Sequence, residues 1–101
     1  FRMKKWNIYL VRCNDNSLYT GITIDVNRRI SEHASSSKRG AKYLQGKGPL
    51  KLVLSMVVGE KSDALKLENC VKKLTKKEKE LLILNPKQLN NLMSVAKEAS
   101  L

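Results

Sequence analysis

The sequence predicts an α+β fold, with a small three-stranded antiparallel sheet flanked by helices in the order β-β-α-(α)-β-α-α-α. Three observations predict this fold. Two short β-prone segments, residues 7–11 and 18–23, are separated by a polar turn; a long apolar segment follows at residues 50–58; and most of the later chain has helical periodicity. The 101 residues suffice for one domain with its own core, and we expect a single domain over residues 1–101.

The first two segments are expected to form a β-hairpin, because residues 14–17 (Asn-Asp-Asn-Ser) have turn composition. A symmetric register places Tyr9 opposite Gly21 and Tyr19 opposite Val11. Residues that lie opposite one another in an antiparallel pair share a face of the sheet. Both tyrosines are therefore predicted to project from the same face.

A helix is predicted to follow the hairpin, with Asp25 as its N-cap and its end near Ser35. Val26, Ile30 and Ala34 recur at helical spacing and would form its buried stripe.

The next segment, residues 35–48, is rich in Ser, Gly and Lys and is expected to be mostly loop, with a short helical turn around residues 41–44. Pro49 would start the third strand, where its missing N–H costs little. That strand is apolar enough to lie centrally or against helices on both faces.

Three helices are predicted after the third strand. Ser62 is expected to cap the first of them. Thr75 and Glu78 match the capping box that begins a second helix. Asn85 and Pro86 resemble an N-cap followed by Pro at the first helical position, which would begin the last helix.

The charge of the chain indicates its class of ligand. Twenty Lys and Arg residues against nine Asp and Glu give a net charge of +11, which attracts polyanions such as DNA or RNA. No apolar run approaches the roughly 20 residues of a membrane span, so we expect no membrane insertion. Cys13 and Cys70 lie far apart and are interpreted as reduced thiols of a cytoplasmic protein.

A set of spaced residues indicates a more specific function. Asn7-Ile8-Tyr9 and Tyr19-Thr20-Gly21 are two short signatures ten residues apart from Tyr to Tyr; Arg29 follows ten residues later, His33 four after that, and Glu68 lies further along. With these residues, the segment 6–84 resembles the GIY-YIG nuclease family. It is most similar to the small single-domain branch related to the nuclease domain of excinuclease C and to structure-selective resolvases. Residues 85–101 would add a C-terminal helix.

The resemblance implies a metal-dependent DNA endonuclease that hydrolyses a phosphodiester bond, in DNA repair or recombination. Tyr19 would activate the attacking water, and Tyr9 would assist or orient it. Arg29 would hold the scissile phosphate and, with the metal, lower the pKa of the phenol so that it can act as a base. His33 would position or donate a proton. Glu68 would hold Mg²⁺ or Mn²⁺, and a single carboxylate favours a one-metal mechanism.

Several basic residues are expected to contact the phosphates of the nucleic acid. One group lies in the Gly-rich loop and the other on the helix after the third strand. They are Lys38, Arg39, Lys42, Lys47, Lys72 and Lys73.

The sequence is also compatible with two other functions. The chain could be a non-catalytic nucleic-acid-binding module that keeps the fold, or an accessory subunit whose protein partner supplies specificity. Asn7 replaces the leading Gly of the first signature, and Ile22 stands where some relatives have Lys. Taken singly, the tyrosines could be packing aromatics, and Arg29, His33 and Glu68 could be solvated helix residues.

Overall fold

The computed structural model describes residues 4–34, 44 and 47–98. Its sheet contains β1 (Trp6–Arg12), β2 (Leu18–Thr23) and β3 (Lys51–Gly59), all paired antiparallel in the order β2-β1-β3. The predicted α+β class and three-stranded sheet are confirmed. The expectation that the third strand could lie centrally is wrong: β1 is the central strand, because both other strands pair with it.

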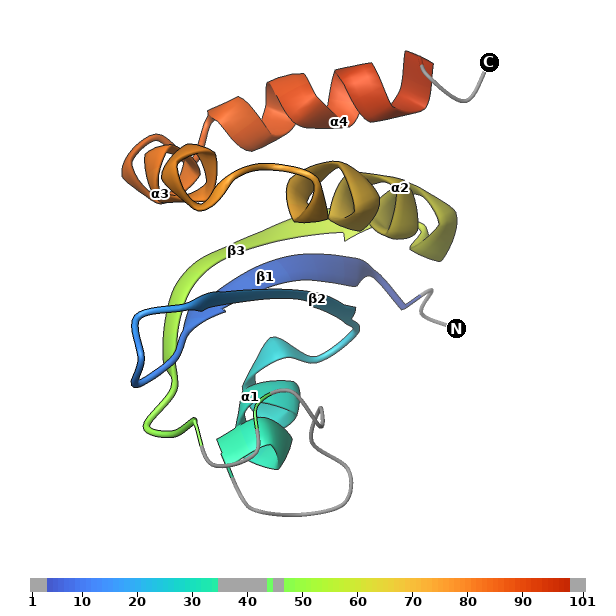
Figure 1. The fold of residues 1–101 in the computed structure, drawn as a ribbon. Coiled ribbons are helices and arrows are strands. Elements are labelled where there is room, and N and C mark those ends of the chain that lie inside the picture. The colour runs from blue at the N-terminus through green and yellow to red at the C-terminus, as the bar shows by residue number, and fades with distance from the viewer. Residues whose placement is uncertain (1–3, 35–43, 45–46, 99–101) are drawn as a thin grey trace.

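Helices cover both faces of the sheet (Figure 1). On one face lies α1 (Val26–Ala34). On the other lie α2 (Lys61–Lys72), α3 (Lys76–Leu84) and α4 (Gln88–Glu98). None of the helices in the described part of the chain is long and apolar enough to cross a membrane.

The hairpin has the predicted register. Tyr9 pairs with Gly21, and Val11 pairs with Tyr19. Its turn is closed by backbone and side-chain hydrogen bonds: the Asp15 carboxylate accepts from both the backbone N–H and the hydroxyl of Ser17, at 3.0 and 2.6 Å. The pairing fixes which side chains share a face, since a slip of one residue would move every side chain to the other face.

Alternation along β1 gives the sheet two separate cores. Ile8 and Leu10 are fully buried against α2–α4, in the larger core. Tyr9 and Val11 point to the opposite face and pack in a smaller cluster with Cys13 and Leu44, against which residues of α1 also pack. Because the smaller core contains Tyr9, the candidate site is built into packed structure.

The helix caps match the sequence at two positions and differ at two others. The Asp25 carboxylate accepts a hydrogen bond from the backbone N–H of Arg28 at 3.1 Å, as a cap of α1 should. At the start of α3, Thr75 and Glu78 form both hydrogen bonds of the predicted capping box, at 3.2 and 2.9 Å.

The expectation that Ser62 caps α2 is wrong. Gly59, with φ +118°, turns the chain directly from β3 into the helix, and the backbone carbonyl of Glu60 already accepts from Ala64. Ser62 therefore lies inside the first turn, and Glu60 is an N-cap without a side-chain hydrogen bond.

The expected start of α4 at Asn85 and Pro86 is also wrong, by two residues. The backbone N–H of Asn85 donates to Leu81 and closes α3. The helix begins at Gln88, whose backbone N–H donates to the backbone carbonyl of Asn85. The expected helical turn around residues 41–44 lies outside the described residues except for the buried Leu44.

The two Ser/Thr positions predicted as caps allow a matched test. Thr75→Ala should lower the free energy of unfolding by about 1 kcal/mol, because it leaves a helix N-terminal N–H without its partner. Ser62→Ala should leave stability unchanged or slightly raised, since Ala is the better helix former at a position inside a helix. Chemical denaturation monitored by circular dichroism checks both; equal losses would contradict this assignment of the caps.

Candidate active site

The centre of the candidate site is the buried hydroxyl of Tyr9. Tyr9 is 1% exposed, and its Oη lies 2.9 Å from Nε2 of His33, on the last turn of α1. The two residues come from the central strand and from the helix packed on it. A hydrogen bond between β1 and α1 is therefore part of the smaller core.

Gly21 makes room for this arrangement. It lies directly opposite Tyr9 in the edge strand β2. A Cβ at this position would lie 2.5 Å from Cζ of Tyr9 and would overlap its hydroxyl as well. The phenol of Tyr9 thus lies across the backbone of β2, and only glycine permits so close an approach.

His33 connects the two tyrosines of the signature. It is 5% exposed, and its ring meets the ring of Tyr19 edge to face, with 5.7 Å between the centroids. Burial, followed by the positive charge of Arg29, lowers the pKa of His33 below its usual range. The imidazole is accordingly neutral at neutral pH.

Arg29 lies one helical turn before His33, and Glu32 holds it. Its guanidinium donates to the Glu32 carboxylate at 3.2 Å and is also hydrogen-bonded to the Tyr9 hydroxyl. With Arg29 donating to Tyr9, the phenol can donate its proton to Nε2 of neutral His33. Glu32 is not among the site residues predicted from the sequence; its spacing of three residues from Arg29 was the only signal for it.

Tyr9, which is expected to assist or orient the water and not to act as the base, is not made a base by Arg29. Burial, followed by the proximity of Tyr19, raises the pKa of Tyr9 to about 12, although the hydrogen bond and the charge of Arg29 both lower it. Tyr9 thus keeps its proton at neutral pH, and its hydrogen bonds suit it to orient other groups.

Glu68 reaches this cluster from α2, on the other side of the sheet. Its charge also raises the pKa of Tyr9, which places the carboxylate within electrostatic range of the phenol. The side chain is 15% exposed, and Lys72, one helical turn later, lies 3.7 Å from it. Tyr9, Tyr19, Arg29 and His33 are thus linked through contacts with Tyr9 or His33, and the link to Glu68 is the effect of its charge on Tyr9.

Protein side chains near Glu68 could supply only some of the ligands that Mg²⁺ needs. No group of three or more His, Cys, Asp or Glu side chains suited to a metal occurs among residues 4–34, 44 and 47–98. Mg²⁺ keeps several waters and is often bound by one or two carboxylates together with substrate phosphate. The single carboxylate of Glu68 is compatible with that mode of binding.

The residues predicted to contact phosphate are divided between two places. Lys72 and Lys73 are exposed at the end of α2, next to Glu68. Lys47 lies at the hairpin turn, 3.3 Å from the Asp15 carboxylate. The others, Lys38, Arg39 and Lys42, lie outside the described residues.

The two departures from the signature have simple structural accounts. The side chain of Asn7 lies in β1 and donates to the backbone carbonyl of Thr23 across the strand pair, at 3.2 Å. The side chain of Ile22 packs against the larger core, on the opposite face from Tyr9. Neither residue disturbs the pairing of Tyr9 with Gly21.

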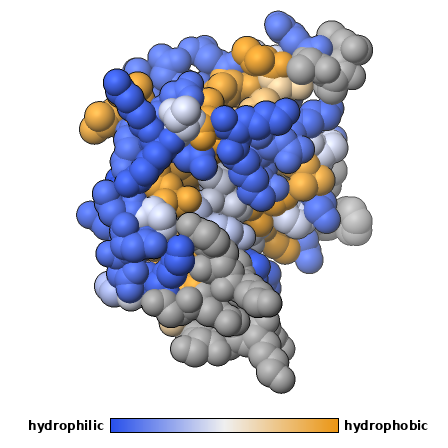
Figure 2. Space-filling model, in the orientation of Figure 1, coloured by the Kyte–Doolittle hydropathy of each residue, from blue (hydrophilic) through white to orange (hydrophobic). Residues whose placement is uncertain are grey.

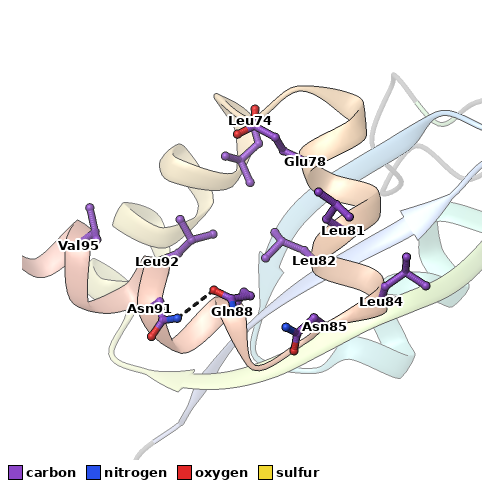
Figure 3. A pocket seen from close by; sticks show the side chains of 10 residues that line it. All are labelled: Leu74, Glu78, Leu81, Leu82, Leu84, Asn85, Gln88, Asn91, Leu92 and Val95. Atoms are coloured by element: carbon purple, nitrogen blue, oxygen red, sulfur yellow. Dashed lines mark hydrogen bonds between the residues drawn. The ribbon is translucent and has the colours of Figure 1, made fainter.

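A larger hollow is separate from this cluster. It has a volume of about 500 Å³ and lies between α3 and α4, lined mainly by leucines (Figure 3). Leu81 and Leu84 are more than half exposed there. None of the five candidate catalytic residues lines this hollow, so we do not identify it with the active site even though it is large.

This fold and cluster define a class of protein. Residues 5–81 match the family model of the GIY-YIG catalytic domain, and the chain belongs to the GIY-YIG family. The family is one of nucleases, so the resemblance that the signature residues predict is confirmed.

Particular relatives are UPF0213 proteins. The chain is 52% identical to one from Cronobacter sakazakii, over 80% of this chain and 83% of that protein. It is 54% identical to the UPF0213 protein YhbQ of Escherichia coli K12, over 80% and 79%. A solution NMR structure of a UPF0213 protein from Bacillus halodurans is 39% identical, with a TM-score of 0.52, covering 85% of this chain and 93% of that one.

The high pKa of Tyr9 can be measured directly. Absorbance of tyrosinate near pH 11 should be the same for the wild type and Tyr9→Phe, because a phenol with a pKa of about 12 is only about a tenth ionised there. Circular dichroism must show that both proteins remain folded. An excess of about one ionised tyrosine in the wild type would contradict the assignment.

Gly21→Ala should displace the Tyr9 phenol and break its hydrogen bond with His33. We expect a destabilised protein with a changed Tyr9 environment, seen as a lowered melting temperature and altered near-ultraviolet circular dichroism. The matched control is Gly48→Ala, because a Cβ at Gly48 meets no atom within 4 Å. Equal behaviour of the two variants would show that the close approach at Gly21 has no energetic consequence.

Proposed function

We propose that this protein is a divalent-metal-dependent DNA endonuclease that acts by a one-metal mechanism in DNA repair or recombination. The whole chain, residues 1–101, serves in this proposal as one nuclease domain. The observation that carries it is the convergence of Tyr9, Tyr19, Arg29 and His33 from three elements, with Glu68 approaching from a fourth. The net charge of +11 supports a nucleic-acid substrate.

Each residue of the cluster can have a separate role in phosphodiester hydrolysis. Arg29 is the cation placed to bind the scissile phosphate, and Glu32 holds it in orientation. Tyr19 is proposed to accept the proton of the attacking water, because its side chain is more exposed than that of Tyr9. Tyr9 is committed to hydrogen bonds with Arg29 and His33, and it orients both.

His33 is assigned to position the phenols. Its lowered pKa keeps the imidazole neutral, so that one ring nitrogen accepts a hydrogen bond from Tyr9. Its ring also packs against Tyr19, which fixes the second phenol relative to the first.

Glu68 is the residue that would hold the metal. The bound cation would neutralise the charge that develops on the phosphoryl oxygens in the transition state. Lys72 would be released from its ion pair with Glu68 and become available to the phosphate backbone.

One assay tests the activity. Purified protein with Mg²⁺ or Mn²⁺ is incubated with labelled duplex, single-stranded, flap and branched DNA. Divalent-dependent cleavage of at least one substrate supports the proposal. DNA binding without cleavage on every substrate would support the non-catalytic module, and cleavage that appears only with an added protein partner would support the accessory subunit.

Replacement of Arg29 should nearly abolish cleavage. Arg29→Ala removes the phosphate-binding fork, and Arg29→Lys should also fail because an ammonium cannot make the planar bidentate contact. Arg28→Ala is the matched control, since Arg28 is the exposed neighbour on the same helix and its side chain lies outside the cluster. Near-normal turnover of Arg29→Lys would show that a point charge suffices.

Replacement of Glu68 separates metal binding from stability. Glu68→Gln should reduce cleavage by about a hundredfold or more, because the loss of a metal's stabilisation costs several kcal/mol and each ~1.36 kcal/mol is tenfold in rate. DNA affinity without metal should hold or rise, since a negative charge has been removed. The control is Glu98→Gln, an equal change on an exposed residue at the end of α4. Unchanged turnover of Glu68→Gln would remove Glu68 from the mechanism.

A further inference from the structure

A second feature suited to nucleic acid lies at the beginning of β1 and of α2. The indole of Trp6, the only tryptophan of the chain, is partly exposed there, and Nζ of Lys61 lies 5.0 Å from its ring centroid. A hollow of about 370 Å³ adjoins it. Lys4, Lys5 and Lys61 line this hollow against one acidic residue, Glu60.

The chemistry of this hollow matches one unpaired nucleotide. An aromatic ring offers a stacking surface to any base, and nearby lysines attract the phosphates on either side of it. Gly59 adds no side chain to the wall, and a Cβ there would meet nothing within 4 Å. The hollow therefore has open space beside the indole.

Two elements connect the hollow to the candidate active site. Along β1, Trp6 precedes Tyr9 by three residues, a distance of about 10 Å at the usual rise of a strand. Along α2, Lys61 precedes Glu68 by seven residues, which is also about 10 Å. The side chain of Trp6 lies on the α2 face of the sheet with Ile8 and Leu10, opposite the ring of Tyr9, so α2 is the element that places the hollow near the candidate metal ligand Glu68.

Charged residues line the side of α2 that connects the hollow to Glu68. Lys61, Glu68 and Lys72 recur at i, i+7 and i+11, so they lie on one side of the helix. The buried residues Ala64 and Val71 lie on the adjoining face, against the sheet. The candidate metal ligand is therefore flanked by a cation at each end of one helical stripe.

We propose that Trp6 and Lys61, with Lys4 and Lys5, form a binding site for an unpaired nucleotide of the DNA strand beside the scissile phosphate. Bases inside a duplex are stacked on their neighbours and cannot offer a face to Trp6. The substrate class is then DNA with a single-stranded segment next to the cleavage point. This inference rests on the proposed function, because it places the site relative to the cleaved bond.

Fluorescence of the sole tryptophan tests the site without cleavage. In EDTA, a short oligothymidylate should quench Trp6, and an abasic strand of equal length should bind through its phosphates with much less quenching. Trp6→Leu should weaken binding of the oligothymidylate by about tenfold or more. Lys61→Gln, an exposed change that leaves the core intact, should lower the log–log salt slope of binding by about 1.

Lys87→Gln is the control for charge, because Lys87 is exposed on the turn between α3 and α4. Equal quenching by the abasic strand, or wild-type affinity and salt slope in both Trp6→Leu and Lys61→Gln, would overturn the site. Normal cleavage by those same variants would then show that the nuclease activity does not require the site at Trp6 and Lys61. Quenching by a protein that cleaves no substrate would overturn the activity and support the site.

Discussion

Tyr9 lies opposite Gly21 in the first strand pair, and the candidate site depends on that pairing. Because Gly21 has no side chain, the phenol can cross the edge strand and place its hydroxyl 2.9 Å from His33. That hydrogen bond joins the sheet to α1, and α1 in turn positions Arg29. A change at Gly21 would therefore move three of the five candidate catalytic residues together.

The same alternation that aims Tyr9 at α1 divides the protein into two cores. The larger core, under α2–α4, contains the aliphatic residues of the sheet's other face and stabilises the fold. The smaller core contains Tyr9 and His33, and their burial has an electrostatic consequence. Both are held in their neutral forms, so Tyr9 can hydrogen-bond His33 and also serve as a partner of Arg29.

The chain has a net charge of +11, and hydrophilic side chains predominate on the face shown in Figure 2. A net positive charge attracts nucleic acid but does not by itself choose a position along it. Selection of a position requires contacts of another kind. Arg29 on α1 and the indole of Trp6 at the start of β1 are the two groups proposed to supply such contacts.

Local patterns in the chain were enough to predict the α+β class, the hairpin register, the cap at Asp25 and the capping box at Thr75, because each depends on neighbours close in sequence. The hairpin register placed Tyr9 and Tyr19 on one face, and helical spacing placed Arg29 beside His33; the resemblance to the GIY-YIG family grouped all four. The remaining features follow from tertiary packing. The pairing of Arg12 with Glu80, at 2.6 Å, and the approach of Glu68 to Tyr9 join elements far apart in sequence, which local patterns do not encode. The high pKa of Tyr9 likewise follows from its burial among residues of several elements, and burial is a property of the packed fold.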